Sequence, residues 1–385
     1  EQRHPQWDAA RAAKIVSQET GARLIFASPA PSVERYYFLK KDNPLPQRII
    51  LQENPQGEVT LIDIKNESQK AISHSLEQRT AAALEQKQKV LLFLNRRGNA
   101  TAIFCQDCKY SFTCQNCESP LVYHQSKKML ICHYCAQQQN IPLFCPKCKS
   151  PEIVLRGKGT EKVVEELRAL FPSASLAKID LDSPYLPKEM PDIIVGTQLI
   201  FSSLPTLLMA QIKLVGVISA DTILNIPDYT SHERTFQMLM EIRLLAQTNN
   251  VPLLIQTYRP ENYAITCAAA GDYQTFYRQE LQERQKFSYP PFSHLIKLNC
   301  LFKTKNKGEK DAFLLYQTLD KEAKNVYNER IGVLPPFCSD RKIKGQYQWL
   351  ILIKSPVPPD HQDLHKFLDK LPIKWNIEVD PESLS

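Results

Sequence analysis

Four Cys-x-x-Cys pairs within one short stretch constrain this chain more than any other feature of its sequence. The pairs are Cys105/Cys108, Cys114/Cys117, Cys132/Cys135 and Cys145/Cys148. Two residues between cysteines let a tight turn aim both sulfurs at one tetrahedral ion, so two pairs supply the four ligands of a structural zinc site. Disulfides are disfavoured because the sequence has no secretory signal and crowds its cysteines into pairs. The pattern predicts two tetrathiolate zinc sites.

The four pairs can share two ions sequentially, or nested so that the outer pairs close around the inner ones. Fourteen residues separate Cys117 from Cys132, which is close to a zinc-ribbon spacing, and residues 121–124 facing 129–131 are typical of a hairpin. This spacing favours the nested arrangement. His124 and His133 are expected to be hairpin or solvent-exposed residues, because eight thiolates already fill two sites.

The length and net charge of the chain limit its number of domains and its possible partners only broadly. With 385 residues, 43% of them hydrophobic, the chain can form two or three domains. A net charge of +7 is compatible with a polyanionic partner but identifies none by itself. No apolar run is long enough to span a membrane, so we expect a monomeric cytoplasmic protein without a membrane partner. Because the chain opens at Glu1 rather than Met, we expect further sequence upstream.

Alternating apolar runs and helical patterns predict an α/β fold with a parallel sheet covered on both faces. Thr230 and Glu233 are spaced as a capping box that would open one of the helices. The predicted strands are residues 22–26, 59–64, 90–94, 193–195, 214–218 and 253–256, with predicted helices at 75–88 and from Thr160 to Phe171.

The pattern of predicted strands and helices changes from about Phe287. Residues 289–292, Tyr-Pro-Pro-Phe, are typical of a stiff aromatic linker, and strands such as 349–353 then mix with helices. We therefore expect a small α+β domain at the carboxy-terminal end. Cys267, Cys300 and Cys338 stand among apolar neighbours and are expected to be packed thiols.

Several strings occur in one order along the chain and together carry a resemblance. They are residues 95–98 (NRRG), 157–161 (GKGTE), 196–198 (GTQ), 220–228 (ADTILNIPD), 233–236 (ERTF), 345–347 (GQY) and 375–381 (WNIEVDP). In this order the chain resembles the carboxy-terminal half of the primosomal protein N′ (PriA) family, the bacterial replication-restart DNA helicases of superfamily 2. Nearly all of the sequence is covered by the resemblance.

The resemblance implies an ATP-dependent 3′ to 5′ helicase architecture with two RecA-like lobes, a zinc insertion and a final domain that docks on forked DNA. It implies forked or single-stranded DNA, primosome proteins and the machinery that loads the replicative helicase as partners. The implied divisions are 1–45 (end of the first lobe), 46–104 (start of the second lobe), 105–150 (zinc insertion), 151–285 (rest of the second lobe) and 286–385 (carboxy-terminal DNA-binding domain).

The resemblance also implies which cysteines share an ion. One Zn²⁺ would be held by Cys105, Cys108, Cys145 and Cys148, and the second by Cys114, Cys117, Cys132 and Cys135. This assignment agrees with the nested arrangement that the spacing favours.

The chain departs from the family where ATP is bound and hydrolysed. It has no G-x-x-x-x-G-K-[ST] loop and no acidic box for magnesium, so ATP and Mg²⁺ would bind only with a functional upstream lobe. Where the family has Q-V-A-G-R-A-G-R, residues 241–248 lack both arginines. Arg243, two places before the first of them, is expected to be a solvent-exposed helix arginine.

Two further strings, which in the family couple ATP hydrolysis to movement along DNA, have also changed. Residues 28–32 read SPAPS where the family has SATPS, and residues 201–203 (FSS) replace the expected Lys-Gly. Three altered coupling strings predict an ATPase that is impaired or lost, which leaves open whether this chain is part of an enzyme.

Residues suited to nucleic acid or nucleotide are better preserved. Arg96 and Arg97 are adjacent cations after a predicted strand, which suits contact with phosphate. Cations alternate with aromatics, as in a stacking groove, at Arg341, Lys342, Lys344, Tyr347 and Trp349. The sequence fits Trp349 equally well as a core residue. Gly159, at the start of a helix, could line a phosphate nest. Asp221 follows a buried strand, where it could orient catalytic water or cap a turn.

Three functions compete. The first is a replication-restart protein that binds branched DNA and helps to assemble the primosome, with little or no helicase activity. The second is an active 3′ to 5′ helicase whose nucleotide-binding lobe lies upstream of Glu1. The third is a non-enzymatic, zinc-dependent module that mediates only protein contacts. The intact cysteine pairs beside altered coupling strings favour the first.

Overall fold

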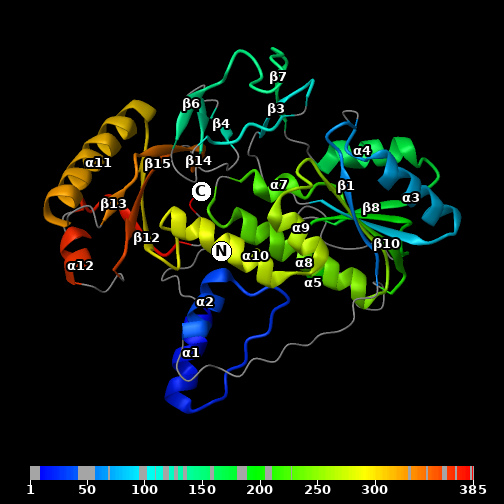
Figure 1. The fold of residues 1–385 in the computed structure, drawn as a ribbon, viewed down its shortest axis with the longest axis horizontal. Coiled ribbons are helices and arrows are strands. Elements are labelled where there is room, and N and C mark those ends of the chain that lie inside the picture. The colour runs from blue at the N-terminus through cyan, green and yellow to red at the C-terminus, as the bar shows by residue number, and fades with distance from the viewer. Residues whose placement is uncertain are drawn as a thin grey trace.

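A computed structural model of the protein has an α/β lobe, a cysteine-rich region above it and an α+β unit at the carboxy-terminal side (Figure 1). Helix α2 (Val33–Lys41) packs on the lobe, where Val33 and Tyr36 are buried, and α1 (Ala9–Thr20) extends away from it. The structure describes residues 9–41, 57–67, 70–94, 102–108, 110–115, 121–124, 129–132, 137–156, 160–179, 189–203, 210–226, 228–327, 331–343, 346–357, 362–368, 371–381 and 384.

The predicted strand at residues 22–26 is wrong. These residues have no strand structure, and Ile25 and Phe26 are 74% and 52% exposed. An apolar run becomes a buried strand only where another strand can pair with it. Within the described ranges, no such neighbour lies beside this segment, because the first strand along the chain pairs elsewhere.

The lobe is built on a parallel sheet of six strands in the order β1-β11-β10-β2-β9-β8. Every strand predicted for residues 59–256 is confirmed, with small shifts at the ends. The strands are β1 (Val59–Asp63), β2 (Lys89–Phe93), β8 (Leu176–Ile179), β9 (Ile193–Gly196), β10 (Ile212–Val217) and β11 (Leu253–Thr257).

Alternate residues of each strand enter two separate cores, which is why the strands are apolar throughout. In β2, Leu91 and Phe93 face one core and Val90 and Leu92 the other. Helices α3 (His74–Glu85) and α4 (Thr160–Leu170) cover the second core, and the first lies under α8 (Ser231–Thr248), α9 (Tyr263–Ala270) and α10 (Tyr273–Lys286). The predicted coverage of both faces is therefore confirmed. Two short helices, α5 (Ile200–Ser203) and α7 (Asp221–Leu224), follow β9 and β10.

The predicted capping box of α8 is wrong, although the helix is present. The Thr230 hydroxyl donates to Asp228 at 2.8 Å instead of accepting from the helix. The Glu233 carboxylate accepts from the backbone N–H of Val33 at 3.0 Å and pairs with Arg284. Tertiary partners therefore take both side chains away from the local cap.

The cysteine-rich region forms its own antiparallel sheet in the order β6-β5-β4-β3-β7. The predicted hairpin is confirmed, because Val122, Tyr123 and His124 pair with Ile131, Leu130 and Met129. The strands are β3 (Ala102–Cys105), β4 (Val122–His124), β5 (Met129–Ile131), β6 (Gln138–Asn140) and β7 (Ile153–Arg156).

The carboxy-terminal residues form the expected α+β arrangement. Helix α11 (Lys305–Tyr327) packs on an antiparallel sheet in the order β13-β15-β12-β16, and β14 pairs with β15. Trp349 is buried in this core, which agrees with the second of its two expected roles, a core residue rather than a stacking platform. The remaining elements are β12 (His294–Phe302), β13 (Gly332–Val333), β14 (Phe337–Ile343), β15 (Gln346–Ser355), α12 (Gln362–Leu368) and β16 (Asn376–Val379).

Residues 289–292 are a packed junction between the lobe and the carboxy-terminal sheet. The ring of Tyr289 is buried and stacks on Tyr229 with centroids 4.8 Å apart. Lys354 of β15 places its Nζ 3.6 Å from the centre of the Tyr289 ring, and the Arg284 guanidinium carbon lies 5.3 Å from the centre of the Tyr229 ring. Two stacked rings with a cation at each therefore join the two parts.

A buried ion network surrounds Arg284, which is only 1% exposed. Its guanidinium pairs with Glu233 of α8, and its Nε donates to Glu280 of its own helix α10 at 2.8 Å. The second oxygen of Glu280 accepts from the Tyr263 hydroxyl at 2.6 Å. Each carboxylate is thus both paired and hydrogen-bonded, as buried charges must be.

Replacing Arg284 with Met should be strongly destabilising, because it leaves two carboxylates buried without a counter-charge. We expect the free energy of unfolding to fall by about 3–5 kcal/mol. Urea denaturation would measure it. Arg278→Met, an exposed position of the same helix, is the matched control and should change stability by no more than about 0.5 kcal/mol. Similar losses for the two variants would contradict the role assigned to Arg284.

Candidate metal centre

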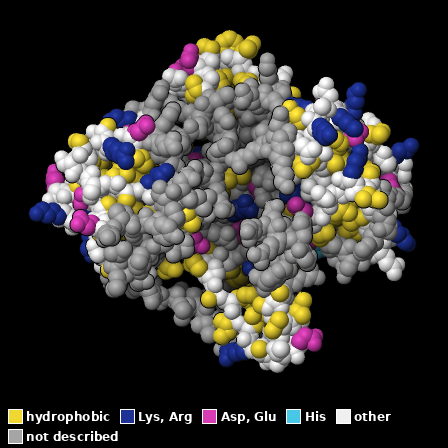
Figure 2. All heavy atoms as spheres, turned by 180° about the vertical axis from the view of Figure 1, so that it is seen from behind, with side chains coloured by type: hydrophobic (Ala, Val, Ile, Leu, Met, Phe, Trp, Pro, Cys, Tyr) yellow, Lys and Arg dark blue, Asp and Glu magenta, His cyan; other side chains and the backbone are white. Residues whose placement is uncertain are grey.

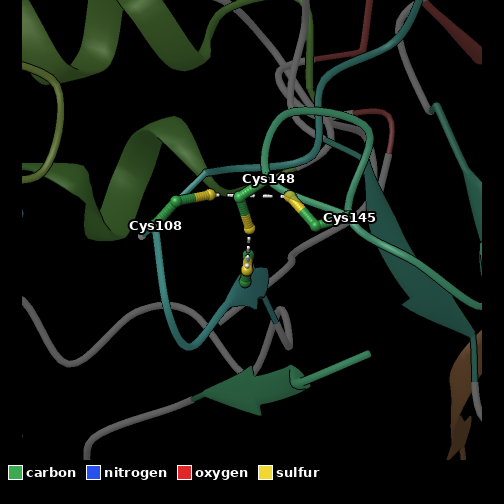
Figure 3. Close-up of side chains that lie close together, drawn as sticks. Cys108, Cys145 and Cys148 are labelled. Carbon is green, nitrogen blue, oxygen red and sulfur yellow. Dashed lines mark hydrogen bonds between the residues drawn. The ribbon is translucent and has the colours of Figure 1, made fainter. Parts of the chain in front are cut away.

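Four cysteines from two distant turns converge at one point (Figure 3). Strand β3 ends at Cys105, and the following turn carries Cys108. Cys145 and Cys148 precede β7, which pairs with β3 so that Ile153 stands opposite Cys105. This pairing places the two turns side by side. The four sulfurs lie within 4.8 Å of one another, with Sγ–Sγ distances of 3.5 Å for Cys105–Cys148 and for Cys108–Cys145.

The turns are closed by the same backbone hydrogen bond. The N–H of Cys105 donates to the carbonyl of Tyr110 at 2.9 Å, and that of Cys145 donates to Ser150 at 2.7 Å. In the second turn Lys149 takes a φ of 63° and donates its N–H to the carbonyl of Cys145 at 2.9 Å. Closing each turn in this way brings both of its sulfurs to one side.

The chemistry of the four sulfurs suits a divalent metal. Burial acts to raise the pKa of Cys105, but the backbone N–H groups of Cys108 and Asp107 and the Cys148 thiol stabilise the thiolate and lower that pKa to about 7. Burial raises the pKa of Cys108 to about 12. A metal ion that binds thiolates must therefore displace protons from this cluster, so its affinity should rise with pH.

The spacing of the sulfurs fits zinc. A tetrahedral ion with Zn–S bonds of about 2.3 Å requires sulfurs about 3.8 Å apart, and the distances within the cluster begin at 3.5 Å and stay within 4.8 Å. A disulfide would need sulfurs about 2.05 Å apart. Cys105, Cys108, Cys145 and Cys148 thus form a set of four thiols with the separations of zinc ligands.

The inner cysteine pairs are only partly within the described residues. Cys114 and Cys132 are buried in one hydrophobic cluster, and the N–H of Cys132 donates to the carbonyl of Gln137 at 2.8 Å. This is the same turn-closing bond as at Cys105 and Cys145. Cys117 and Cys135 lie outside the described residues, so the second zinc site stays a prediction.

Two of the other predicted site residues, Tyr347 and Asp221, lie within the described part of the chain. Tyr347 is half-buried and packs against the carboxy-terminal core. Its proposed role in binding DNA is untested. The remaining four positions lie outside the described residues: Arg96, Arg97, Lys344 and Gly159.

Asp221 lies at the start of α7 and is enclosed by the end of β11. Its carboxylate accepts from the Thr257 hydroxyl and the Tyr258 N–H, both at 2.9 Å. Burial raises its pKa, and the nearby Arg259 opposes the shift. These contacts account for Asp221 as a residue that fixes the turn, and its predicted role in nucleotide binding is untested.

Arg259 links the lobe to the cysteine-rich region and was missed by the sequence analysis. Its Nη2 donates to the Ser111 hydroxyl at 2.8 Å and to the Asn225 side-chain oxygen at 2.9 Å. The side chain is buried. Nothing in the local pattern after β11 indicates partners so distant in sequence, and only the fold brings them together.

The expectation that Arg243 is solvent-exposed is wrong. Its side chain is buried, and Nη1 donates to the carbonyl of Ala269 at the end of α9. The helix then terminates at Gly271, whose φ is 73° and whose added Cβ would lie 3.1 Å from the guanidinium. Arg243 therefore binds the carboxyl end of α9, which favours a cation there.

The two arginines expected from the resemblance would stand at the positions of Leu245 and Thr248. Leu245 packs against the core of the lobe, and the Thr248 hydroxyl donates to the carbonyl of Leu244 in its own helix at 2.8 Å. The changed SPAPS string lies nearby. Its Ala30 is buried, and the Ala30 carbonyl accepts from Gln237 of α8 at 3.3 Å.

Two family models match the chain. One, described as the PriA DNA helicase Cys-rich region domain, matches residues 114–139, and the other, the primosomal protein N C-terminal domain, matches residues 285–382. Together with the four-sulfur cluster, the first match indicates that the chain binds zinc. None of the helices in the described part of the chain is long and apolar enough to cross a membrane.

The chain is also similar to curated proteins named replication restart protein PriA. It is 32% identical to the protein of Synechocystis over 91% of this chain and 45% of that protein. The identity is 30% with the protein of Treponema pallidum, over 98% of this chain and 59% of the relative. It is also 30% with the Bacillus subtilis protein, over 91% and 45%. The chain thus spans about half the length of these relatives.

Replacing Cys145 with Ser should remove the metal of the described cluster, because three thiolates and a hydroxyl bind zinc much more weakly than four thiolates. We expect the zinc content per chain to fall by about one ion, as measured by elemental analysis after purification without chelators. Cys338→Ser, at a buried thiol of the carboxy-terminal core, should leave the zinc content unchanged. An unaltered zinc content in the Cys145 variant would refute the assignment.

Proposed function

We propose that this chain, which resembles replication restart protein PriA over most of its length, binds branched DNA and helps to assemble the primosome. Supporting this proposal, one hydrophobic cluster joins the zinc-binding region, the lobe and the carboxy-terminal sheet. Its members include Ile103, Phe112, Leu130 and Cys132 of the zinc region, Tyr229 of the lobe, and Leu295 and Leu352 of the carboxy-terminal sheet.

The shared cluster is suited to recognising a junction. A DNA fork has arms that leave one point in different directions, so a protein that prefers it must hold separate contact surfaces at a fixed mutual orientation. Leu384 strengthens the joint, because its N–H donates to Asp228 of the lobe at 2.8 Å while its side chain enters the cluster. Such a joint lets the two surfaces act as one unit.

The proposal also covers the number of zinc ions, the partners and the cellular compartment. Two Zn²⁺ ions per chain are proposed, because Cys132 closes its turn like the first cysteine of each outer pair. The proposed partners are forked or single-stranded DNA, primosome proteins and the machinery that loads the replicative helicase. Thiolate ligands fit a reducing cytoplasm.

ATP hydrolysis by this protein is proposed to be weak or lost. Catalysis of phosphoryl transfer needs arginine at the transferring group. The guanidinium of Arg243 already binds the Ala269 carbonyl, and Leu245 and Thr248 offer no cation.

Two observations favour competing functions. The N–H of Val33, just after the SPAPS string, donates to Glu233 of α8. A coupling element of an active helicase with an upstream lobe would make such a contact with the second lobe. Leu143 and Phe144, beside Cys145, are 81% and 56% exposed, which fits a zinc module that contacts only proteins.

A binding titration with fluorescent DNA tests the main proposal. The protein should bind a three-arm fork more tightly than a linear duplex of equal length and composition, by about tenfold, which corresponds to about 1.4 kcal/mol. The affinity should fall steeply as salt is added, because phosphate contacts release counterions. Equal affinity for both DNAs would argue against fork recognition, and no salt-dependent binding at all would favour the protein-contact module.

Phosphate release separates the first two functions. We expect the whole protein to show no DNA-stimulated release of phosphate from ATP above a reaction without protein, because the arginines for the transition state are missing. An active PriA assayed beside it provides the positive control. Stimulated release would instead support the active helicase.

A further inference from the structure

Helix α11 of the carboxy-terminal domain has a buried face and an exposed face of different chemistry. The buried face packs on the sheet and uses small or apolar residues at a spacing of three or four. At Gly308 the helix approaches so closely that an added Cβ would lie 2.3 Å from the ring of Trp349. The buried residues are Gly308, Ala312, Leu315, Leu319 and Ala323.

The exposed face carries a row of lysines, named here the α11 lysine row. It begins two residues before the first helical residue, and its members follow at separations of three, four or eleven residues along the outer side. Its members are Lys303, Lys307, Lys310, Lys321 and Lys324, all exposed. Lysine and arginine side chains lie at both ends of the molecule, and one of these ends carries α11 (Figure 2).

The acidic residues of the helix do not interrupt this row. At about 100° of rotation per residue, Glu309, Asp311, Asp320 and Glu322 fall on the two flanks between the lysine row and the buried face. Asp311 is paired with Lys374 at 2.6 Å, and Asp320 with Lys324 at 2.7 Å. Among the described residues, no ion pair involves Lys303, Lys307, Lys310 or Lys321.

Two exposed apolar residues divide the row into two groups. Phe313 and Leu314 are 47% and 66% exposed, and they lie between Lys310 and Lys321. At a rise of 1.5 Å per residue, the eleven steps between these lysines cover about 16 Å. This distance is slightly larger than the width of about 12 Å of the DNA major groove. A helix laid across the groove could therefore place its two lysine groups near the phosphates of opposite strands.

We propose that the α11 lysine row binds the phosphate backbone of a duplex DNA arm, with Phe313 and Leu314 over the groove. This inference rests on the proposed function, and it names the surface on which one arm of the branched DNA lies. The clustering of the cations on the outer side of one helix and the near absence of pairing among them favour a polyanion as the partner. Two apolar residues are too few for the helix to lie in a membrane surface.

The test compares two triple variants of equal net charge. Lys307→Gln/Lys310→Gln/Lys321→Gln removes three members of the row, and Lys65→Gln/Lys87→Gln/Lys213→Gln removes three lysines of the lobe. The probes are the fork and the linear duplex, titrated from low to moderate salt. In the first variant the slope of log affinity against log salt should become shallower by about 0.9 for each lost phosphate contact, up to about 2.7.

Each outcome decides one question. Equal slopes and affinities for wild type and the α11 variant would overturn the inference, while fork binding by both would leave the proposed function standing. If the wild-type protein binds neither DNA, the proposed function itself fails. An equal loss in both triple variants would also overturn the inference, since net charge rather than the α11 row would then govern binding. Thermal denaturation should give the two variants similar midpoints, because all six side chains lie at the surface.

Discussion

The buried guanidinium of Arg284 is the interaction on which the arrangement of this chain depends. Removing a cation and two carboxylates from water is costly, and only good pairing and further hydrogen bonds offset that cost. Here Glu233 also holds the first N–H of α2, and Glu280 also holds the Tyr263 hydroxyl. The positions of α2, α8, α9 and α10 are therefore linked, because moving any of them would leave a buried charge without a partner.

The same guanidinium supports the contact between the lobe and the carboxy-terminal domain. It lies against Tyr229, which stacks on Tyr289, and the ammonium of Lys354 lies over the Tyr289 ring. Both tyrosines belong to the cluster that contains Cys114 and Cys132. The inner part of the zinc-binding region is thus packed into the joint. It follows that the zinc region and the carboxy-terminal sheet stabilise each other through the lobe, and that loss of either should loosen the joint.

The sequence allowed the sheet and the hairpin to be predicted because both depend on local patterns. Strands such as β2 are continuous apolar runs, and the β4–β5 hairpin is bounded by cysteine turns of fixed geometry. The convergence of four sulfurs likewise follows from the spacing of the pairs. What the pattern could not reveal are contacts between distant residues: Glu233 matches a capping box in sequence, yet its partners are Val33 and Arg284. For the same reason the exposed Ile25 and Phe26 and the buried Arg243 were misjudged.

The altered coupling strings have a physical consequence beyond the chemistry they lack. Phe201, where the resemblance leads one to expect Lys-Gly, has its ring 6.0 Å from that of Phe93 and packs on the core of the lobe, as Leu245 does. Ala30 is buried against the same core, and Arg243 binds the carboxyl end of α9. A residue that must move or bind phosphate during a catalytic cycle cannot also be a fixed part of the core. These substitutions therefore add to the packing of the lobe at positions where a motor needs mobility. Under the proposed function, a lobe packed in this way would hold the zinc region and the carboxy-terminal domain in place rather than drive them along DNA.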